Sequence, residues 1–567
     1  TTLTLGTSGD TVVVPSGVQL APGGGLTLTG ALVVDGGTIK LDGNYPTGTD
    51  NVALGNTALD SVEAGGINNV AIGDNAGTAI TTGDCNVAVG KDALTTNSTG
   101  TRNTAIGQGA LTANTTADNN TAVGKNSMVA NTEGHSNVAV GANALDANTT
   151  GDNNTAIGMD ALTANTTANQ NTAVGDEALK LNTTGDCNTA VGKGSLDTNT
   201  TGTRNVAVGG EALGANTTAS FNNALGYKAL CSNTTGASNI SIGTCSMRIN
   251  TTGANNVAVG DKALCANTTA SNNTAVGNAA LCLNTTGTDN IAMGSCTLDA
   301  NTTGNSNTAI GRLSLTANTT GSNNSAVGAG SLLTNTTGDS NVAFGVSSLR
   351  LNTTGDFNTG IGLCSIYTNT TGGCNTALGN DSLRANTTGS ENTTVGSASM
   401  LLNTTGASNA AMGRSALRNN TTGASNVAVG KNAGEANTTG SNNIAIGDSA
   451  LISNTTNTTN IAIGASALYA NNAAGDNLAI GQQAAAANLS GYHLTSIGHY
   501  SLLVNTSAQG NTAVGHSSLR ATTTGAANTA VGKQSLCKNT TGGNNVALGY
   551  AALCTNTTGA NNIAVGY

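Results

Sequence analysis

Small apolar residues recur along this chain at fixed distances from a glycine. Residues 86–102 read NVAVGKDALTTNSTGTR, and residues 103–119 read NTAIGQGALTANTTADN. A glycine preceded by a small and an apolar residue returns every seventeen residues from Gly73 to Gly566, without insertion or deletion. Because the loops of compact domains tolerate length changes, so regular a period predicts a solenoid in which each repeat forms one coil.

Two short segments of each repeat carry the apolar pattern. With the glycine as position 0, the segment before it reads Asn-x-Ala-Val/Ile, and a second segment is centred on Ala-Leu at positions 3 and 4. We interpret both as strands, with the second burying positions 4 and 6. Position 5 is expected to face solvent, because it accepts charges such as Lys180 and Arg350. The Asn-Thr-Thr-Gly segment at positions 7–10 predicts a turn whose glycine has a positive φ.

Stacking such coils predicts an all-β fold, a parallel β-roll in which two sheets lie face to face. The asparagines at positions −4 and 7 are expected to form ladders, in which each amide bonds to its equivalent in the next coil. The only substitution of the asparagine at position −4 is Leu494. The residues that define this architecture are Asn86, Asn103, Asn120, Asn97, Asn114, Asn131, Gly90, Gly107, Gly124, Leu94 and Leu111.

The period divides the chain into two regions. Residues 1–50 lack it and contain short β-branched runs punctuated by glycine, which predict a β-rich stalk or adaptor. The solenoid of about thirty coils covers residues 51–567 and contains no proline, as expected where strands pair on both sides. Because the chain begins at Thr1 rather than Met and stops within a repeat at Tyr567, we expect a fragment of a longer protein.

The Asn-x-Ala-Val/Ile segment carries no charged residue in any coil. A strand without a solvent-tolerant side is typical of burial on both faces. One face can pack inside the roll, whereas the other needs a partner. We therefore infer lateral self-association of the chain along this segment.

The N-x-A-V/I-G pattern resembles the head repeats of trimeric autotransporter adhesins of the YadA type. The longer unit, NTAVGxxALxxNTTGxxN, is similar to arrays in long tail-fibre proteins of bacteriophages. This resemblance covers residues 51–567 and implies a left-handed β-roll with three chains around one axis. It implies a fibre shaft that projects a receptor-binding tip for host attachment, on a virion or, alternatively, in a bacterial surface adhesin head. The coils here are longer than those of the adhesin heads, and no anchor domain is present.

Composition and charge narrow the possible functions. The chain has 78 glycines, no tryptophan and only 8% charged residues, but its apolar residues recur in register, which argues against disorder. The net charge is −10 and the lysines and arginines are scattered, so no basic surface for nucleic acid is expected. No apolar run approaches the ~20 residues of a membrane-spanning helix.

The eleven cysteines have an odd count and a scattered spacing, which predict neither a disulfide framework nor a zinc site. Cys265 and Cys282, and likewise Cys537 and Cys554, would be neighbours on adjacent coils. Because side chains in a parallel register point the same way, a bridge between them would be strained. We expect free thiols.

No catalytic constellation is evident, so we expect neither an enzyme nor a bound cofactor or metal. His135, His493, His499 and His516 are few and scattered; His493 and His499 share one irregular coil, which allows a local ligand site, but we favour surface substitutions. No GxxxxGK[ST] phosphate loop occurs.

The Asn-Thr-Thr segments have two further possible meanings. They match N-glycosylation acceptors, but a glycan on every coil could not be accommodated, so we interpret them as turn chemistry. Their threonines would also form ladders, which raises the possibility of an ice-binding solenoid. That function is disfavoured because these threonines lie in a turn rather than on a flat strand face.

Overall fold

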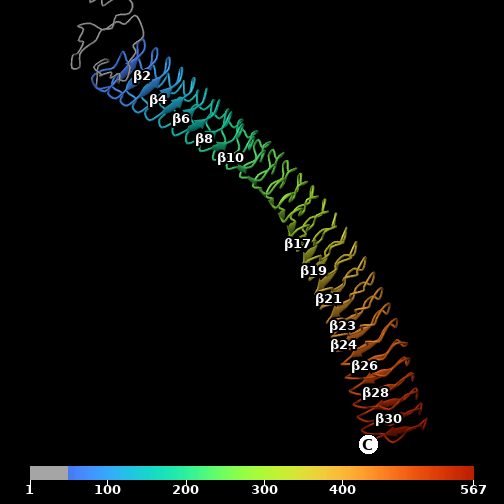
Figure 1. The fold of residues 1–567 in the computed structure, drawn as a ribbon. Coiled ribbons are helices and arrows are strands. Elements are labelled where there is room, and N and C mark those ends of the chain that lie inside the picture. The colour runs from blue at the N-terminus through green and yellow to red at the C-terminus, as the bar shows by residue number, and fades with distance from the viewer. Residues whose placement is uncertain (1–48) are drawn as a thin grey trace, which may run out of the picture.

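The computed structural model describes residues 49–567, which form one gently curved rod of stacked coils (Figure 1). The predicted fold class is confirmed: the described residues form an all-β parallel solenoid with a spacing of seventeen residues and no helix. The predicted stalk over residues 1–50 lies, except for Thr49 and Asp50, outside the described residues.

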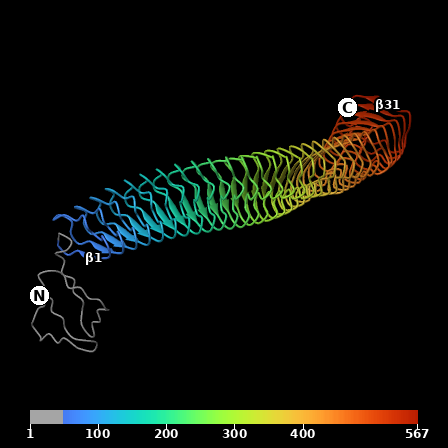
Figure 2. The same cartoon turned by 90° about the horizontal axis from the view of Figure 1, so that it is seen from above.

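Each coil contributes one strand of three residues. The first two strands are β1 (Val52–Leu54) and β2 (Val70–Ile72), and every later strand begins seventeen residues after the one before, as far as β31 (Ile563–Val565). Each strand pairs in parallel with the strands of the neighbouring coils. The result is a single sheet of 31 strands that runs the length of the rod (Figure 2).

The register aligns equivalent residues of successive coils. In β13 (Val257–Val259) and β14 (Thr274–Val276), Ala258 pairs with Ala275 and Val259 with Val276. In both strands the alanine points into the coil and is buried, whereas the residues on either side of it point outward. The strand therefore follows the alternation that its sequence predicts.

The predicted second strand, around Ala-Leu, is wrong. The chain there forms turns, and Asp92, Leu94 and Arg102, at positions 2, 4 and 12, have φ angles of 58°, 53° and 57°. The left-handed conformation at positions 2 and 4 breaks the alternation of an extended strand, so positions 3 and 4 both face inward. Position 6 faces outward instead, since Leu283 is 53% exposed. The coil consequently has one sheet rather than two face to face.

From position 4 onward, every third residue is buried in the interior of the coil. Leu94, Asn97, Gly100 and Asn103 are all buried, and the two residues between each pair are half-buried or exposed. Leucine and alanine thus fill one part of the interior, and asparagine amides and small residues fill the rest. The glycine at position 10 does not have the predicted positive φ. It is needed because the backbone of the next coil approaches it closely. A Cβ on Gly134 would lie 2.4 Å from the carbonyl oxygen of Gly151 in the next coil.

The glycine at position 0 is needed both for its positive φ and for the close approach of the next coil. Gly107 has a φ of 133°, a conformation that side chains rarely adopt. A Cβ there would also lie 2.4 Å from the carbonyl oxygen of Gly124. This glycine therefore sets the distance between coils at the end of every strand.

Candidate functional surface

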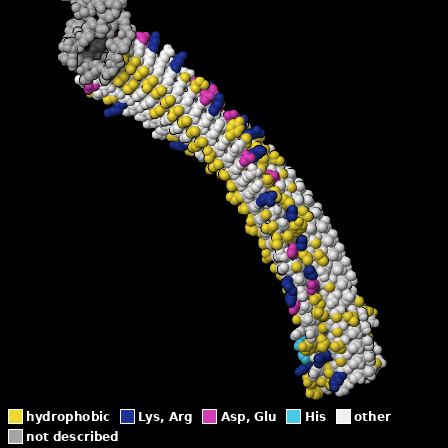
Figure 3. Space-filling view, in the orientation of Figure 1, with side chains coloured by type: hydrophobic (Ala, Val, Ile, Leu, Met, Phe, Trp, Pro, Cys, Tyr) yellow, Lys and Arg dark blue, Asp and Glu magenta, His cyan; other side chains and the backbone are white. Residues whose placement is uncertain are grey.

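The most extended feature of the surface is the outward side of the sheet. We call the outward side chains at positions −3 and −1 of each strand the outer strand face. Figure 3 shows hydrophobic side chains following the rod along its length. Large hydrophobic residues more than a third exposed on this face are Leu54, Ile72, Ile106, Ile157, Val206, Leu225, Ile240, Ile242, Ile291, Met293, Ile310, Phe344, Ile361, Leu378, Val395, Met412, Ile446, Val546, Leu548, Ile563 and Val565.

The outer strand face is the side for which the sequence analysis inferred a partner. In the single chain it is half-buried or exposed, whereas the alanine between its residues is buried inside the coil. Contiguous exposed apolar surface on this scale is typical of protein interaction sites. Val257 at position −3 and Val259 at position −1 can face another chain, whereas Ala258 at position −2 faces the chain's own core.

The strand asparagines link successive coils through their side-chain oxygens. Oδ1 of Asn86 accepts a hydrogen bond from the backbone amide of Asn103 at 2.9 Å, and Oδ1 of Asn103 accepts one from Asn120 at 3.0 Å. Nδ2 of Asn86 donates to the carbonyl oxygen of Gly100 at 2.9 Å. The side chain thus joins its strand both to the next strand and to the turn that lies between the two.

The turn asparagines form a ladder of amides. Nδ2 of Asn114 donates to Oδ1 of Asn97 at 2.7 Å, and Nδ2 of Asn131 donates to Oδ1 of Asn114 at 3.0 Å. Nδ2 of Asn114 also donates to the carbonyl oxygen of Ala117, within its own turn, at 3.0 Å. Because this nitrogen is buried and already donates twice, the folded coil has no room for a glycan on it.

Both ladders are interrupted in one part of the rod. Leu494 offers no oxygen to the following coil, although its own amide still donates to Oδ1 of Asn477 at 3.0 Å. Thr522 replaces the turn asparagine in a later coil. Among residues 49–567, Oδ1 of Asn454 and Oδ1 of Asn505 are buried oxygens without a hydrogen bond. Residues 454–522 are therefore a segment in which several coil junctions lack an amide contact.

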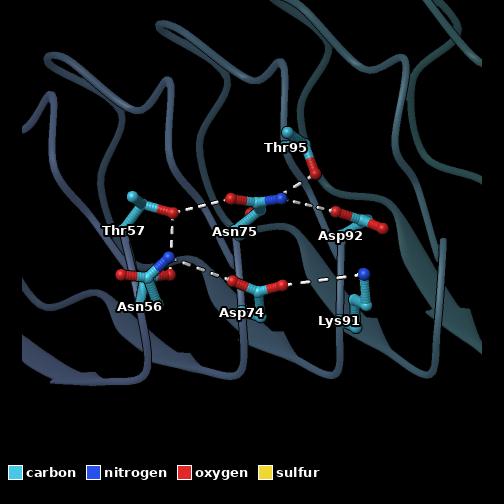
Figure 4. A network of polar contacts seen from close by, with 7 residues as sticks. All are labelled: Asn56, Thr57, Asp74, Asn75, Lys91, Asp92 and Thr95. Atoms are coloured by element: carbon cyan, nitrogen blue, oxygen red, sulfur yellow. Dashed lines mark hydrogen bonds and ion pairs between the residues drawn. The ribbon is translucent and has the colours of Figure 1, made fainter.

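A polar network covers another side of the rod near its described N-terminal end (Figure 4). Oδ1 of Asn75 accepts from the hydroxyl of Thr57 at 2.6 Å, and its Nδ2 donates to Asp92 at 2.9 Å. Lys91 and Asp74, at position 1 of adjacent coils, form an ion pair of 3.7 Å. Lys91 is exposed and Asp74 is half-buried, so the contribution of this ion pair to stability is modest.

Small residues leave a shallow hollow of about 580 Å³ further along the rod. Gly194, Gly210 and Gly214 line it, and Tyr227 borders it. An ion pair of 3.4 Å between Lys228 and Glu211 neighbours the hollow. The hollow makes the surface of the rod less uniform than its repeat, but the residues that line it form no catalytic constellation.

His493 and His499 share one irregular coil, but they do not form a common ligand site. His499 stacks on Tyr500, with ring centroids 3.7 Å apart, and meets His516 of the next coil edge-on at 5.4 Å. His493 lies 4.0 Å from Asp476 instead. Within residues 49–567, no three His, Cys, Asp or Glu side chains are grouped so as to hold a metal ion.

No protein-family model matches this chain, and no curated protein matches its sequence. The part of the chain that the structure describes contains no helix of the length and hydropathy needed to cross a bilayer.

Proposed function

We propose that this chain is the shaft of a homotrimeric fibre, as in bacteriophage tail fibres, which holds a receptor-binding tip away from the virion. The observation that carries the proposal is the single sheet of 31 strands, in which every coil repeats the same register. At about 4.8 Å per coil, such a sheet spans roughly 140 Å. The described residues are thus suited to separating two objects.

The outer strand face supports self-association of the shaft. It repeats with the spacing of the coils, so a second copy of the chain can match it over its whole length. Its lack of charge favours burial against an apolar surface. Three chains around one axis is the arrangement implied by the resemblance of the N-x-A-V/I-G pattern to trimeric adhesin heads.

The experiment measures mass and length together. Light scattering of the purified chain should give three times the monomer mass, and electron microscopy should show rods with a solenoid section of roughly 140 Å. A soluble monomeric rod would contradict the trimer, and a compact particle would contradict the shaft. Antibodies against the chain should label virion tails; labelling of bacterial cell surfaces instead would favour the alternative of an adhesin head.

A second candidate function is adsorption to ice. The turn threonines suit it poorly, because their hydroxyls donate to the next coil, as Thr115 does to the carbonyl oxygen of Thr132 at 3.2 Å. However, the structure also places threonines on the outer strand face, where Thr104 of β4 (Thr104–Ile106) pairs with Thr121 of β5 (Thr121–Val123). Thermal hysteresis of a solution of the chain tests this candidate, and none is expected if the face is covered in a trimer.

A further inference from the structure

One repeat position of three consecutive coils holds Arg248, Cys265 and Cys282, each at position 5 and seventeen residues apart. We call this set the first Arg–Cys–Cys column. Sequence analysis considered the two cysteines only as neighbours. The structure adds that two backbone hydrogen bonds fix their coils together on either side of Cys265. The amide of Leu264 donates to Ala280 at 3.0 Å, and the amide of Ala266 donates to the carbonyl oxygen of Cys282 itself at 2.8 Å.

Both thiols are half-buried, so small reagents can reach them. The pKa of Cys265 is lowered from 9.0 to about 6, first of all because its thiolate accepts a hydrogen bond from the Cys282 thiol. Arg248 lowers it further by its charge and by a hydrogen bond, and Lys262 contributes charge, while burial acts in the opposite direction. The pKa of Cys282 is raised by the same hydrogen bond, by burial and by the neighbouring charges of Cys265 and Asp299.

The chain contains its own control, a second Arg–Cys–Cys column of Arg520, Cys537 and Cys554 at the same repeat position. Here the guanidinium of Arg520 lies over the ring of Tyr500, 5.7 Å from its centroid. The Cys537 thiol points to the carbonyl oxygen of Cys554 at 3.7 Å. Burial and the nearby Cys554 raise the pKa of Cys537. The two columns have the same residues in the same register, but the pKa of the first cysteine is lowered in one column and raised in the other.

We propose that Cys265 and Cys282 form a reactive dithiol, which low-molecular-weight disulfides close to a bridge between two adjacent coils. The Cys265 thiolate attacks one sulfur of the small disulfide, forming a mixed disulfide and releasing one small thiolate. Cys282 then loses its proton to solvent and attacks the Cys265 sulfur, which releases the second small thiolate. The pair loses two electrons and two protons, and the small disulfide is reduced to two thiols. Adjacent coils of the parallel stack lie about 4.8 Å apart, which falls in the Cα separation that disulfides span, and the strain expected for a bridge in parallel register makes that bridge readily reducible.

The pH dependence gives the sharpest signature. At pH 6 about half of Cys265 is thiolate, against about 0.1% of a thiol with a pKa of 9.0. A thiolate of lower pKa is also a weaker nucleophile, which reduces this advantage to about 20-fold. At pH 10, where both are ionised, Cys265 should instead react about 20-fold more slowly. A cysteine that is merely more accessible would be faster at both pH values.

The test uses the full chain with oxidised glutathione, and peptide mass spectrometry follows each cysteine. At pH 6, Cys265 should react at least 20-fold faster than Cys537, and a Cys265–Cys282 disulfide should follow. Arg248→Gln should slow Cys265 several-fold at pH 6, whereas Arg520→Gln should slow Cys537 much less, because Arg520 acts on that thiol only weakly and through its charge alone. Cys282→Ala should leave any adduct of Cys265 as the mixed disulfide.

Three results would overturn the proposal. The first is a Cys265 rate at pH 6 no greater than that of Cys537. The second is a mixed disulfide that persists at Cys265 in the wild-type chain, since that would show that Cys282 cannot complete the bridge. The third is an unchanged Cys265 rate in Arg248→Gln, provided that the variant still forms rods by electron microscopy.

Discussion

The strand of each coil and the turn at positions 3 and 4, which we call the corner, are both apolar. They bury their side chains by different rules. In the strand, Val257 and Val259 face outward and Ala258 inward, as in any extended segment. At the corner, Ala263 and Leu264 are adjacent and both are fully buried. Only the first arrangement leaves an apolar side uncovered, so the strand is where a partner chain can add most to the stability of the rod.

The corner achieves this arrangement through unusual backbone angles. Leu264 has a φ of 50°, and the left-handed region costs about 1–2 kcal/mol for a residue with a Cβ. Full burial of a leucine side chain contributes about 1.5–3 kcal/mol. The two are of similar size, so the corner is favourable only because the leucine is completely enclosed.

The largest expected effect comes from placing charge on the outer strand face. Val259→Asp together with Val276→Asp should abolish self-association, because two carboxylates per chain would be buried without partners. Size-exclusion chromatography with light scattering measures it. The matched control is Thr252→Asp with Thr286→Asp, at exposed turn positions of two coils, which should associate like the wild type. If the strand-face variant still forms trimers, the contact lies elsewhere on the rod.

The next effect compares two leucines that the sequence analysis placed on the same side. Leu264→Ala should destabilise its coil by about 2–5 kcal/mol, because it removes a completely buried side chain. Leu283→Ala, at position 6 of the next coil, should cost less than about 1 kcal/mol, because that side chain is 53% exposed. Hydrogen exchange of the flanking amides measures both. Equal costs would show that position 6 is buried and would restore the two-sheet model.

A smaller difference is expected between two strand asparagines. Replacing Asn256 by leucine removes the acceptor for Asn273 and both donations of its amide nitrogen, to Ala270 and Asn239. Asn477 accepts similarly from Leu494 and donates to Gly491. Because it lacks the amide-to-amide bond, Asn477→Leu should cost about 1 kcal/mol less than Asn256→Leu. Equal shifts in hydrogen exchange around the two sites would argue against cooperative ladders.

The smallest effect should follow from removing three whole coils. Deletion of residues 260–310 joins equivalent positions of the repeat, so strand, corner and ladders all re-form in register. The rod should shorten by about 14 Å, with its thermal stability and host attachment unchanged. Electron microscopy and an adsorption assay measure these properties. A shortened, well-assembled rod that no longer attaches would mean that the deleted coils bind the host, which contradicts a purely structural shaft.

The repeat length and the strand could be predicted because glycine and the alternation around it are explicit in every repeat. The corner was mispredicted, although the sequence held two signals. Gly77 and Gly434 replace leucine at position 4 with φ angles of 57° and 59°, and such exceptions indicate a left-handed position rather than a broken strand. The spacing of Leu94, Asn97 and Gly100 also has a period of three rather than two.

The difference between the two Arg–Cys–Cys columns could not be predicted in the same way. Both columns have the same residues at the same repeat position. In the first column the Cys282 thiol donates a hydrogen bond to Cys265 and Arg248 adds its charge. In the second column the Cys537 thiol points to the carbonyl oxygen of Cys554, and Arg520 lies over the ring of Tyr500. A repeat position specifies the backbone, whereas the charge around a side chain depends on its neighbours in space.

The interrupted ladders have a consequence for how the rod would fail under load. Its coil-to-coil hydrogen bonds are arranged in series along the axis, so a pulling force acts on every junction equally and the weakest one yields first. The junctions within residues 454–522 include Leu494 and the unbonded oxygens of Asn454 and Asn505. Stretched between two beads, the rod should part at one of these junctions before it parts where both ladders are complete, and the coils on either side should stay folded.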